Sequence, residues 1–542
     1  MRSAIVLLLA LSGASAAADD TFAALRRMPV QDGGRVKPLD TFARETARRV
    51  TGARAFGNES VKGLDPVEWI VALWAAPEAW RQERIVRVAD ATLRGHAGLP
   101  GERERFSFDE LVGNERFMAA AEEARGLQDS GAALSSEGQG ALRLYGELSL
   151  MAAVVAGDAP KVAAGGPDGA WLSLRELGGA GPEARALEAL LVAYRAGDRA
   201  AIAAAASGLR TVLAAAQPLG EDAPVQLARE VRYNRVKPFR ASWLLYLAAF
   251  LALVSTLAVP SRALSTIGLA LMTAGFGVQT YGFVLRALIA QRAPVANMYE
   301  TIVFASWGAV LFALVFEALH GTRLFAACAS GLSVAFLLLA DSVPIFDAAI
   351  DPLAPVLRDN FWLSSHVLTI TLGYAALLLA LALGHVTLGM LFLGRGEARV
   401  RTVSGFTYRA MQAGTLLLAA GTLLGGVWAS YSWGRFWGWD PKETWALIAL
   451  LVYLAILHAR FAGWIRDLGL AVGSIVGGLS VLMAWYGVNY VLGTGLHSYG
   501  FGSGGGTGWV AAYVALELAL VAAVAWRVRA PRTAPGFAHS HS

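Results

Sequence analysis

Long apolar segments follow one another through the second half of the chain, and they restrict the fold more than any other feature. Each of nine segments is long enough to cross the ~30 Å core of a bilayer as a helix rising about 1.5 Å per residue. They lie near 241–258, 264–289, 300–319, 324–340, 362–393, 411–430, 442–461, 468–491 and 509–527. The chain is 56% hydrophobic and 16% charged, with a mean hydropathy of +0.48, which is too apolar for a soluble enzyme. We therefore predict an all-α polytopic membrane protein with about nine transmembrane helices within residues 241–530.

The first 240 residues have a different character. Residues 1–18 combine Arg2, a short apolar stretch and small residues, which is the pattern of a secretory signal peptide; an uncleaved anchor is the alternative. Residues 19–240 have helical patterning and no long apolar run, so we expect a mainly helical, exported soluble domain. Its opening, residues 28–45, is expected to be extended and turn-like. The polar residues 531–542 are expected to form a cytoplasmic tail.

Arginine and lysine are distributed unevenly between the loops. If the N-terminal domain is exported, the inner loops and tail hold eleven of these residues, and the outer loops after residue 290 hold four. This asymmetry obeys the positive-inside rule. The asymmetry therefore places residues 19–240 and the loop before residue 442 on the outer side of the membrane that we expect to hold the chain, the bacterial inner membrane.

Cysteine content and charge exclude two classes of function. The single cysteine, Cys328, allows neither an intramolecular disulfide nor a CxxC redox pair, so thiol chemistry would have to come from another protein. The net charge of +5 is modest, and no basic run with interleaved aromatic residues indicates nucleic-acid binding.

An unusual aromatic segment, "WGRFWGWDPKETW" at 433–445, lies on the predicted outer loop between the sixth and seventh apolar segments. We call its first three tryptophans, Trp433, Trp437 and Trp439, the tryptophan platform. Asp440 suits a helix N-cap, and the Asp-x-x-Glu spacing to Glu443 predicts a capping box that starts the seventh helix. The platform either anchors the protein at the membrane surface or supports a flat ligand.

Histidines favour the second interpretation. His366 lies about one turn into the fifth segment from the outside, and His497 lies on the outer loop after the eighth segment. Two imidazoles beside large rings are what a six-coordinate haem requires. His458, eighteen residues after Asp440, lies roughly 27 Å deeper and indicates a second, inner site. His385 is a weaker candidate there, because packing or a hydrogen bond explains it as well.

A second outer stretch, "APVANMYETIVFASW" at 293–307, has two interpretations. Asn297, Tyr299 and Glu300 either cap the helix and lie at the interface, or form a wall of the outer site.

These motifs resemble a known family. "WGRFWGWDPKETW" resembles the WWD domain of the haem-handling proteins of cytochrome c maturation, and its "WDPKETW" ending is similar to the CcsA/ResC branch, the system II cytochrome c synthetase component. CcmC and CcmF proteins carry a related loop but continue differently after the aspartate. The resemblance covers roughly 240–530, including "NMYET", "WLSSH" and "GLHSY".

The resemblance implies a function and a ligand set. It places the outer axial ligands at His366 and His497 and an inner ligand at His458, with Trp433, Trp437, Trp439 and Asp440 in the WWD loop (about 431–445). Haem b would bind as the substrate, move from the inner to the outer site, and become attached through thioether bonds to the CxxCH motif of apocytochrome c. The resemblance identifies no catalytic residue.

It also implies partners. In the family, the inner site takes a second histidine from a CcsB/ResB-type subunit, which is sometimes fused. The first apolar segment here looks like the end of such a partner but contains no histidine, so we expect a partial CcsB-like N-terminal region and a separate CcsB/ResB-like subunit. A thioredoxin-like reductant would supply the thiol chemistry.

Three functions remain compatible with the sequence. The first is a haem lyase component, and the second is a haem exporter or chaperone without lyase chemistry. The third is a membrane di-haem electron-transfer protein, which would keep its haems permanently.

Overall fold

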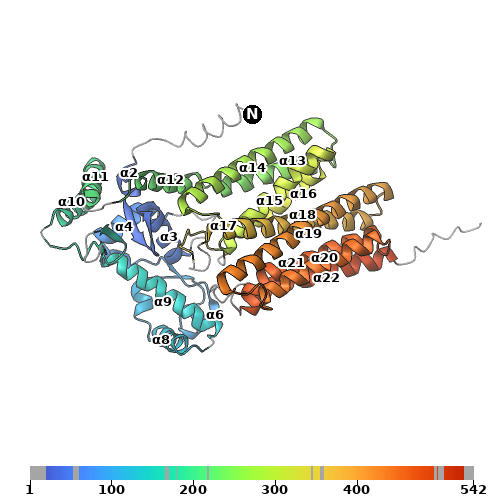
Figure 1. Ribbon diagram of the computed structural model, residues 1–542. Helices are drawn as coiled ribbons and strands as arrows, with labels where there is room; N and C mark the ends of the chain where they lie inside the picture. The colour runs from blue at the N-terminus through green and yellow to red at the C-terminus, as the bar shows by residue number, and fades with distance from the viewer. Residues whose placement is uncertain are drawn as a thin grey trace, which may run out of the picture. The chain divides into compact units, whose positions relative to one another are not determined.

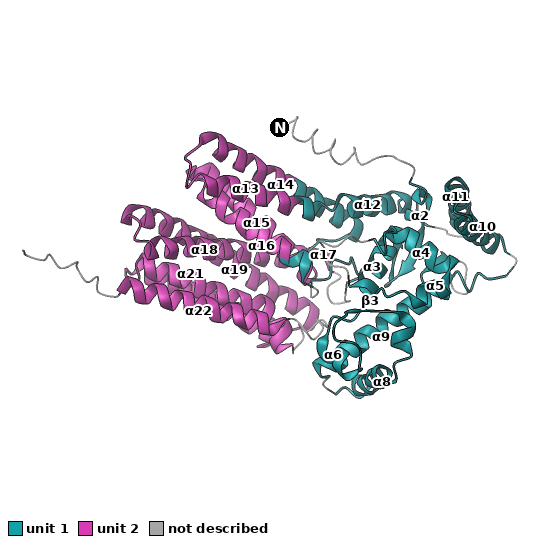
Figure 2. Ribbon diagram, turned by 180° about the vertical axis from the view of Figure 1, so that it is seen from behind, with its two compact units in different colours: residues 1–241, 278–294, 339–353 teal, residues 242–277, 295–338, 354–542 magenta. Residues whose placement is uncertain are grey.

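A computed structural model defines the fold, and it divides the chain into two compact units (Figure 2). Unit 1 comprises Met1–Ala241, Val278–Pro294 and Leu339–Leu353, and unit 2 comprises Ser242–Gly277, Val295–Leu338 and Ala354–Ser542. The structure describes residues 20–52, 60–132, 134–164, 170–179, 181–215, 219–343, 346–353, 359–493, 497 and 506–529. The predicted signal peptide and cytoplasmic tail lie outside these residues.

Unit 1 is mainly helical around a small sheet. The stretch predicted to be extended forms a hairpin of β1 (Pro29–Asp32) and β2 (Arg35–Pro38), joined through two glycines with positive φ, but helix α3 already begins at Leu39. Strands β5 (Lys161–Ala164) and β6 (Trp171–Ser173) complete a sheet of order β2-β1-β5-β6. A two-stranded sheet pairs β3 (Val86–Arg87) with β4 (Arg105–Phe106).

Helices surround these strands and bury one apolar core that includes Trp69 and Phe42. Their bounds are α2 (Ala23–Arg26), α3 (Leu39–Thr51), α4 (Pro66–Ala75), α5 (Pro77–Gln82), α6 (Ala91–His96), α7 (Phe108–Val112), α8 (Glu115–Asp129), α9 (Ser136–Val155), α10 (Pro182–Ala196), α11 (Arg199–Ala215) and α12 (Ala223–Val236). An ion pair joins the half-buried Arg35 of the hairpin to the buried Glu230 of α12 at 2.7 Å. Hairpin and α12 therefore form one packed structure inside unit 1.

The predicted all-α polytopic class is confirmed. Within the described ranges, nine helices are long and apolar enough to cross a membrane (Figure 1). All but the first and the sixth begin and end close to the predicted segments. Their bounds are α12 with α13 (Ala223–Ser255, in which α13 is Pro238–Ser255), α14 (Arg262–Ala290), α15 (Met298–His320), α16 (Leu324–Ser342), α17 with η3 and α18 (Asn360–Phe392), α19 (Glu397–Trp433), α20 (Pro441–Phe461), α21 with η4 (Asp467–Leu492) and α22 (Thr507–Arg529). Helix α19 is longer than the apolar segment at 411–430 predicted, because polar turns precede it.

Small residues set the packing of unit 2, where α18 (Leu368–Phe392) contacts α15, α19, α21 and α22. A Cβ at Gly373 would come within 2.8 Å of the backbone of α19, and one at Gly421 within 2.8 Å of the backbone of α18. Only glycine allows two membrane helices to approach this closely. The close approach of α18 and α19 brings residue 366, at the start of one helix, next to residues 421–428, near the end of the other.

Two π-helical segments interrupt this bundle. Segment η3 (Leu363–Val367) precedes α18, and η4 (Met483–Leu492) follows α21 (Asp467–Leu482). The wider π turn shifts side chains out of the 3.6-residue register and is frequent at functional sites. Both segments contribute residues to the cavity described next.

Candidate functional site

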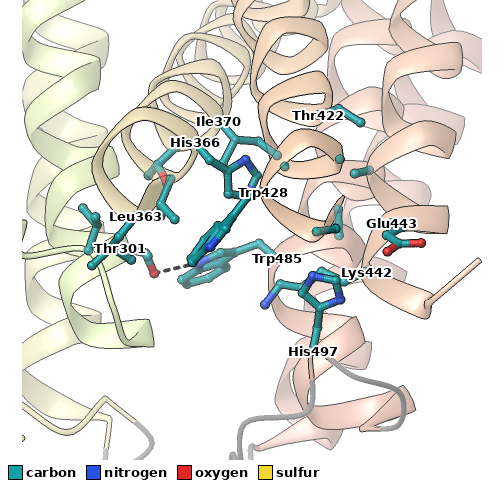
Figure 3. Close-up of a pocket in the computed structure, with 18 of the residues that line it drawn as sticks. Thr301, Leu363, His366, Ile370, Thr422, Trp428, Lys442, Glu443, Trp485 and His497 are labelled. Atoms are coloured by element: carbon teal, nitrogen blue, oxygen red, sulfur yellow. Dashed lines mark hydrogen bonds between the residues drawn. The ribbon is translucent and has the colours of Figure 1, made fainter. Parts of the chain in front are cut away.

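One cavity in unit 2 collects most of the predicted site residues (Figure 3). Its wall is formed by the start of α15, η3, the end of α19, the loop that follows, the start of α20, and η4. His366 and His497 both line it, and so do Trp433 and Trp437. Residues far apart in the chain therefore form one site.

His366 is held at one ring nitrogen. Its Nδ1 lies 2.8 Å from the carbonyl oxygen of Gly421 on α19. A carbonyl only accepts, so Nδ1 carries the proton and the lone pair of the neutral ring belongs to Nε2. Among the residues that the structure describes, Nε2 forms no hydrogen bond. This is the state of an imidazole prepared to bind a metal, with its tautomer set by the backbone.

Glycines on α19 make the room for this ring. A Cβ at Gly425 would lie 2.7 Å from Cε1 of His366, and one at Gly426 would lie 2.6 Å from the ring of Phe436. Real side chains do not approach so closely. The Gly425-Gly426 pair is therefore needed to seat the histidine and the folded-back loop against the same helix.

Glu443 organises the aromatic loop from the first turn of α20. Its Oε1 lies 3.0 Å from Nη1 of Arg435, and its Oε2 accepts from the backbone N–H of Gly438 at 2.7 Å and of Asp440 at 3.3 Å. Gly434 ends α19 with a left-handed φ of 70°, and a Cβ at Gly438 would overlap the guanidinium of Arg435. The two glycines that a simple aromatic belt does not require thus shape this loop.

Asp440 joins the helix cap to the second histidine. The predicted capping box is present, with Asp440 accepting from the N–H of Lys442 at 2.9 Å. The carboxylate also accepts from the N–H of His497, and its Oδ1 lies 3.1 Å from Nδ1 of the same residue. A proton on Nδ1 assigns the ring's lone pair to Nε2, as in carboxylate–histidine pairs at metal sites.

Different surroundings lower the pKa of Asp440 and of His497, which is the direction that ligation needs. Burial would raise the pKa of Asp440, but the hydrogen bonds that its carboxylate accepts from the N–H groups of Lys442 and His497 hold that pKa below its ordinary value. Burial, together with the positive charge of Lys442, lowers the pKa of His497. His497 is therefore neutral at neutral pH, the form that binds a metal.

The three platform tryptophans occupy different positions. Trp433 is the last residue of α19 rather than part of the loop, and its ring meets that of His497 edge to face at a centroid distance of 4.8 Å. Trp437 lines the cavity, whereas Trp439 is 70% exposed, lies outside the lining and packs edge to face on Trp437. Trp439 also has a left-handed φ of 58°, which is uncommon for a bulky residue.

Asn297 both caps a helix and forms part of the cavity wall, the two roles considered for its segment. Its side chain accepts from the N–H of Glu300 at 2.8 Å and caps α15, and the residue also lines the cavity. Glu300 returns the bond by accepting from Ala296, and Tyr299 is buried; neither lines the cavity.

The other two membrane histidines lie elsewhere. His458 is exposed on α20, and its Nδ1 is bonded to the carbonyl of Leu454 at 2.7 Å, so its lone pair also belongs to Nε2. Both nitrogens of His385 are engaged, Nδ1 by the Leu381 carbonyl at 3.0 Å and Nε2 by Glu517 of α22 at 2.8 Å. His385 therefore joins α18 to α22 through a hydrogen bond, which was one of the two alternatives to iron binding. Neither of its ring nitrogens remains to bind iron.

Sequence reasoning missed several lining residues: Trp428, Lys442, Trp485 and Asn489. Trp485 is fixed by a hydrogen bond from Nε1 to Oγ1 of Thr301 at 3.0 Å (Figure 3). Trp428 and Trp485, two tryptophans outside the loop, could have indicated these walls, but the segments that hold them look like ordinary apolar spans.

Comparison with known proteins identifies the family. The family described as "Cytochrome C assembly protein" matches residues 295–497, a range that begins and ends on cavity-lining residues. "Cytochrome c biogenesis protein CcsA" of Synechococcus sp. (strain CC9902) is 35% identical over 253 residues, which cover 40% of this chain and 81% of that protein. The chain belongs to the CcsA-type cytochrome c biogenesis family. It is a multi-pass membrane protein of cytochrome c maturation.

Another CcsA-like relative extends the similarity into unit 1. "Protein NrfI" of Wolinella succinogenes is 30% identical over 493 residues, which cover 86% of this chain. The chain spans about half the length of that relative, since the alignment covers 53% of it. The CcsA protein of Parasynechococcus marenigrum (strain WH8102) is 34% identical over 253 residues, which cover 40% of this chain and 81% of that protein.

Proposed function

We propose that the cavity binds haem b as a substrate between His366 and His497 and presents it for covalent attachment to apocytochrome c. The main support for the proposal is that the two histidines lie in the same cavity and have the same tautomer. Both line one cavity, and each has Nδ1 beside an oxygen acceptor, which assigns the lone pair to Nε2. Two neutral imidazoles are axial ligands of six-coordinate haem.

The aromatic residues would enclose the flat ligand. Trp433 and Trp437 line the cavity and can cover a porphyrin face, while Trp439 would hold Trp437 from outside. Asp440 would fix His497 and begin α20 at the same time, so that the loop and the ligand share one support.

The attachment step is an addition without net oxidation. Each cysteine S–H of the CxxCH motif adds across a haem vinyl group, with sulfur bonding to one carbon and hydrogen to the other. The cysteines must enter as thiols, which is the role of the thioredoxin-like reductant. Cys328 is half-buried in helix α16, and a CcsA-type chain with one cysteine needs that external partner.

His458 would serve an inner haem site shared with a CcsB/ResB-like subunit. It is exposed on α20, and the Leu454 carbonyl holds the proton on Nδ1, so the lone pair of Nε2 could bind iron. With the WWD loop and residues 19–240 on the outer side of the bacterial inner membrane, haem would pass from His458 toward the cavity. In cells, where the inner site supplies the outer one, replacing His458 with alanine should lower haem at both sites, and added imidazole should restore it.

Purification with the CcsB/ResB-like subunit and an apocytochrome tests the proposal. The complex should carry low-spin haem b and yield covalent cytochrome, and the paired His366→Ala and His497→Ala changes should abolish the outer-site spectrum after haem at the inner site is subtracted. Normal covalent yield from this variant would refute the outer site. Low-spin haem without covalent product would favour the haem exporter, and haem that resists transfer to apocytochrome would favour an electron carrier.

A further inference from the structure

A positive side chain lies in the wall of the same cavity. Lys442 is the second residue of α20, and it is the only lysine in the sequence after Lys237. A cation in the first turn meets the positive end of the helix dipole, so helix formation does not favour lysine at this position. Figure 3 shows Lys442 next to His497 in the cavity. The presence of lysine at this position therefore needs an explanation other than helix stability.

Neighbouring groups hold the ammonium at the wall. Its Nζ lies 3.3 Å from Oδ1 of Asn489, and the amide nitrogen of Asn489 donates to the Trp485 carbonyl at 2.6 Å. The asparagine is thus oriented with its oxygen toward the lysine. Asp440 also attracts Lys442, but the same carboxylate serves His497. An ammonium has three donors, and such a group is stabilised further by an anionic ligand.

A second donor in the lining points to the same kind of ligand. Trp428 is only 9% exposed, and its Nε1 has no hydrogen-bond partner within the described part of the chain. Its ring lies 5.8 Å from that of His366, centroid to centroid. An indole N–H only donates, and a buried donor without an acceptor costs free energy. Glu443, the carboxylate among the lining residues, is committed to Arg435 and the loop backbone.

We propose that Lys442 binds a carboxylate of the porphyrin, a propionate, with Trp428 as a neutral donor to the same ligand. The inference rests on the proposed function and adds the contact that orients the porphyrin ring in the cavity. Two axial histidines fix the iron but leave the macrocycle free to turn about the axis through both ligands. A charge on one side of the cavity selects the propionate edge and turns the vinyl edge toward the incoming thiols.

Haem and its dimethyl ester separate this contact from ligation by the histidines. The experiment uses the full chain with His458→Ala, so that the absorbance change reports porphyrin binding in the cavity alone. The protein is purified in detergent, stripped of haem and titrated with each porphyrin. Wild-type Lys442 should bind haem more tightly than the ester. Lys442→Gln should weaken haem binding roughly 30-fold or more, the usual loss when one partner of a buried charge pair is removed, and leave ester binding unchanged.

Matched variants complete the test. Lys442→Arg should keep part of the preference for haem, Lys161→Gln in unit 1 should change nothing, and Trp428→Phe should reduce the preference by a smaller factor. Equal weakening of haem and ester by Lys442→Gln would mean that lysine only shapes the cavity, and an unchanged preference would mean that it does not meet the carboxylate; either result overturns the inference. Failure of the wild-type protein to bind either porphyrin through His366 and His497 would instead refute the proposed function.

Discussion

Gly425→Ala is the smallest change that should remove a haem ligand without touching it. The added Cβ would lie 2.7 Å from Cε1 and 3.0 Å from Nδ1 of His366. Carbon atoms in contact prefer about 3.5–4.0 Å, so the ring must move by roughly 1 Å. That movement stretches the 2.8 Å contact between Nδ1 and the Gly421 carbonyl, a bond worth about 1 kcal/mol.

The fold should survive this change. Replacing glycine by alanine inside a helix favours the helical state by about 1 kcal/mol, which offsets the lost hydrogen bond. Site geometry has no such compensation, because a functional group must be held within about 0.5 Å of its productive position. The protein should therefore accumulate normally while its outer haem loses the low-spin, two-histidine spectrum.

The assay compares three proteins co-expressed with the partner subunit and an apocytochrome. Gly405→Ala is the matched control, since it lies on the same helix and its Cβ would meet nothing within 4 Å. Membrane abundance is measured by immunoblot, coordination by absorbance and product by covalent haem stain. A wild-type spectrum and yield from Gly425→Ala would refute the argument that this glycine seats His366.

Four further predictions address the supports of the site. Asp440→Asn keeps a good N-cap but removes the charge beside His497, so abundance should be normal while haem affinity falls about 10–100-fold; equal loss of abundance would assign Asp440 to folding alone. Burial lowers the pKa of His497, so a spectrophotometric pH titration should show its iron bond persisting as pH falls through about 6.5, the ordinary histidine pKa, and breaking only below it. Trp437→Ala, which removes a cavity wall, should reduce bound haem roughly tenfold or more, and Trp439→Ala should reduce it less, with the reverse order contradicting the described geometry. His385→Leu alone should destabilise the protein in detergent by about 1–3 kcal/mol, because the buried Glu517 loses its imidazole partner and keeps the Tyr513 hydroxyl, whereas leucine at both positions should recover most of that loss in thermal unfolding.

The sequence by itself determined the elements of this protein. In a bilayer each backbone N–H and C=O must be satisfied within its own segment, so a sufficiently long apolar run becomes a helix whatever surrounds it. The start of α20 was equally readable, because the capping box of Asp440 and Glu443 is a contact between residues three apart. Interactions of this kind join residues that are close in the sequence, so the sequence alone predicts them.

Tertiary structure decided which side chains belong to the site. The partner of His385 lies 132 residues away, and the acceptor that sets the tautomer of His366 lies 55 residues away. No local pattern places Trp428 in the cavity wall and Trp439 outside it, because Trp428 meets His366 from another helix and Trp439 has a left-handed backbone. The two π-helical turns, which bring His366 and Trp485 into the cavity, depend on the same packing. Such turns hold only where packing outweighs their local cost, and that packing comes from helices distant in the sequence.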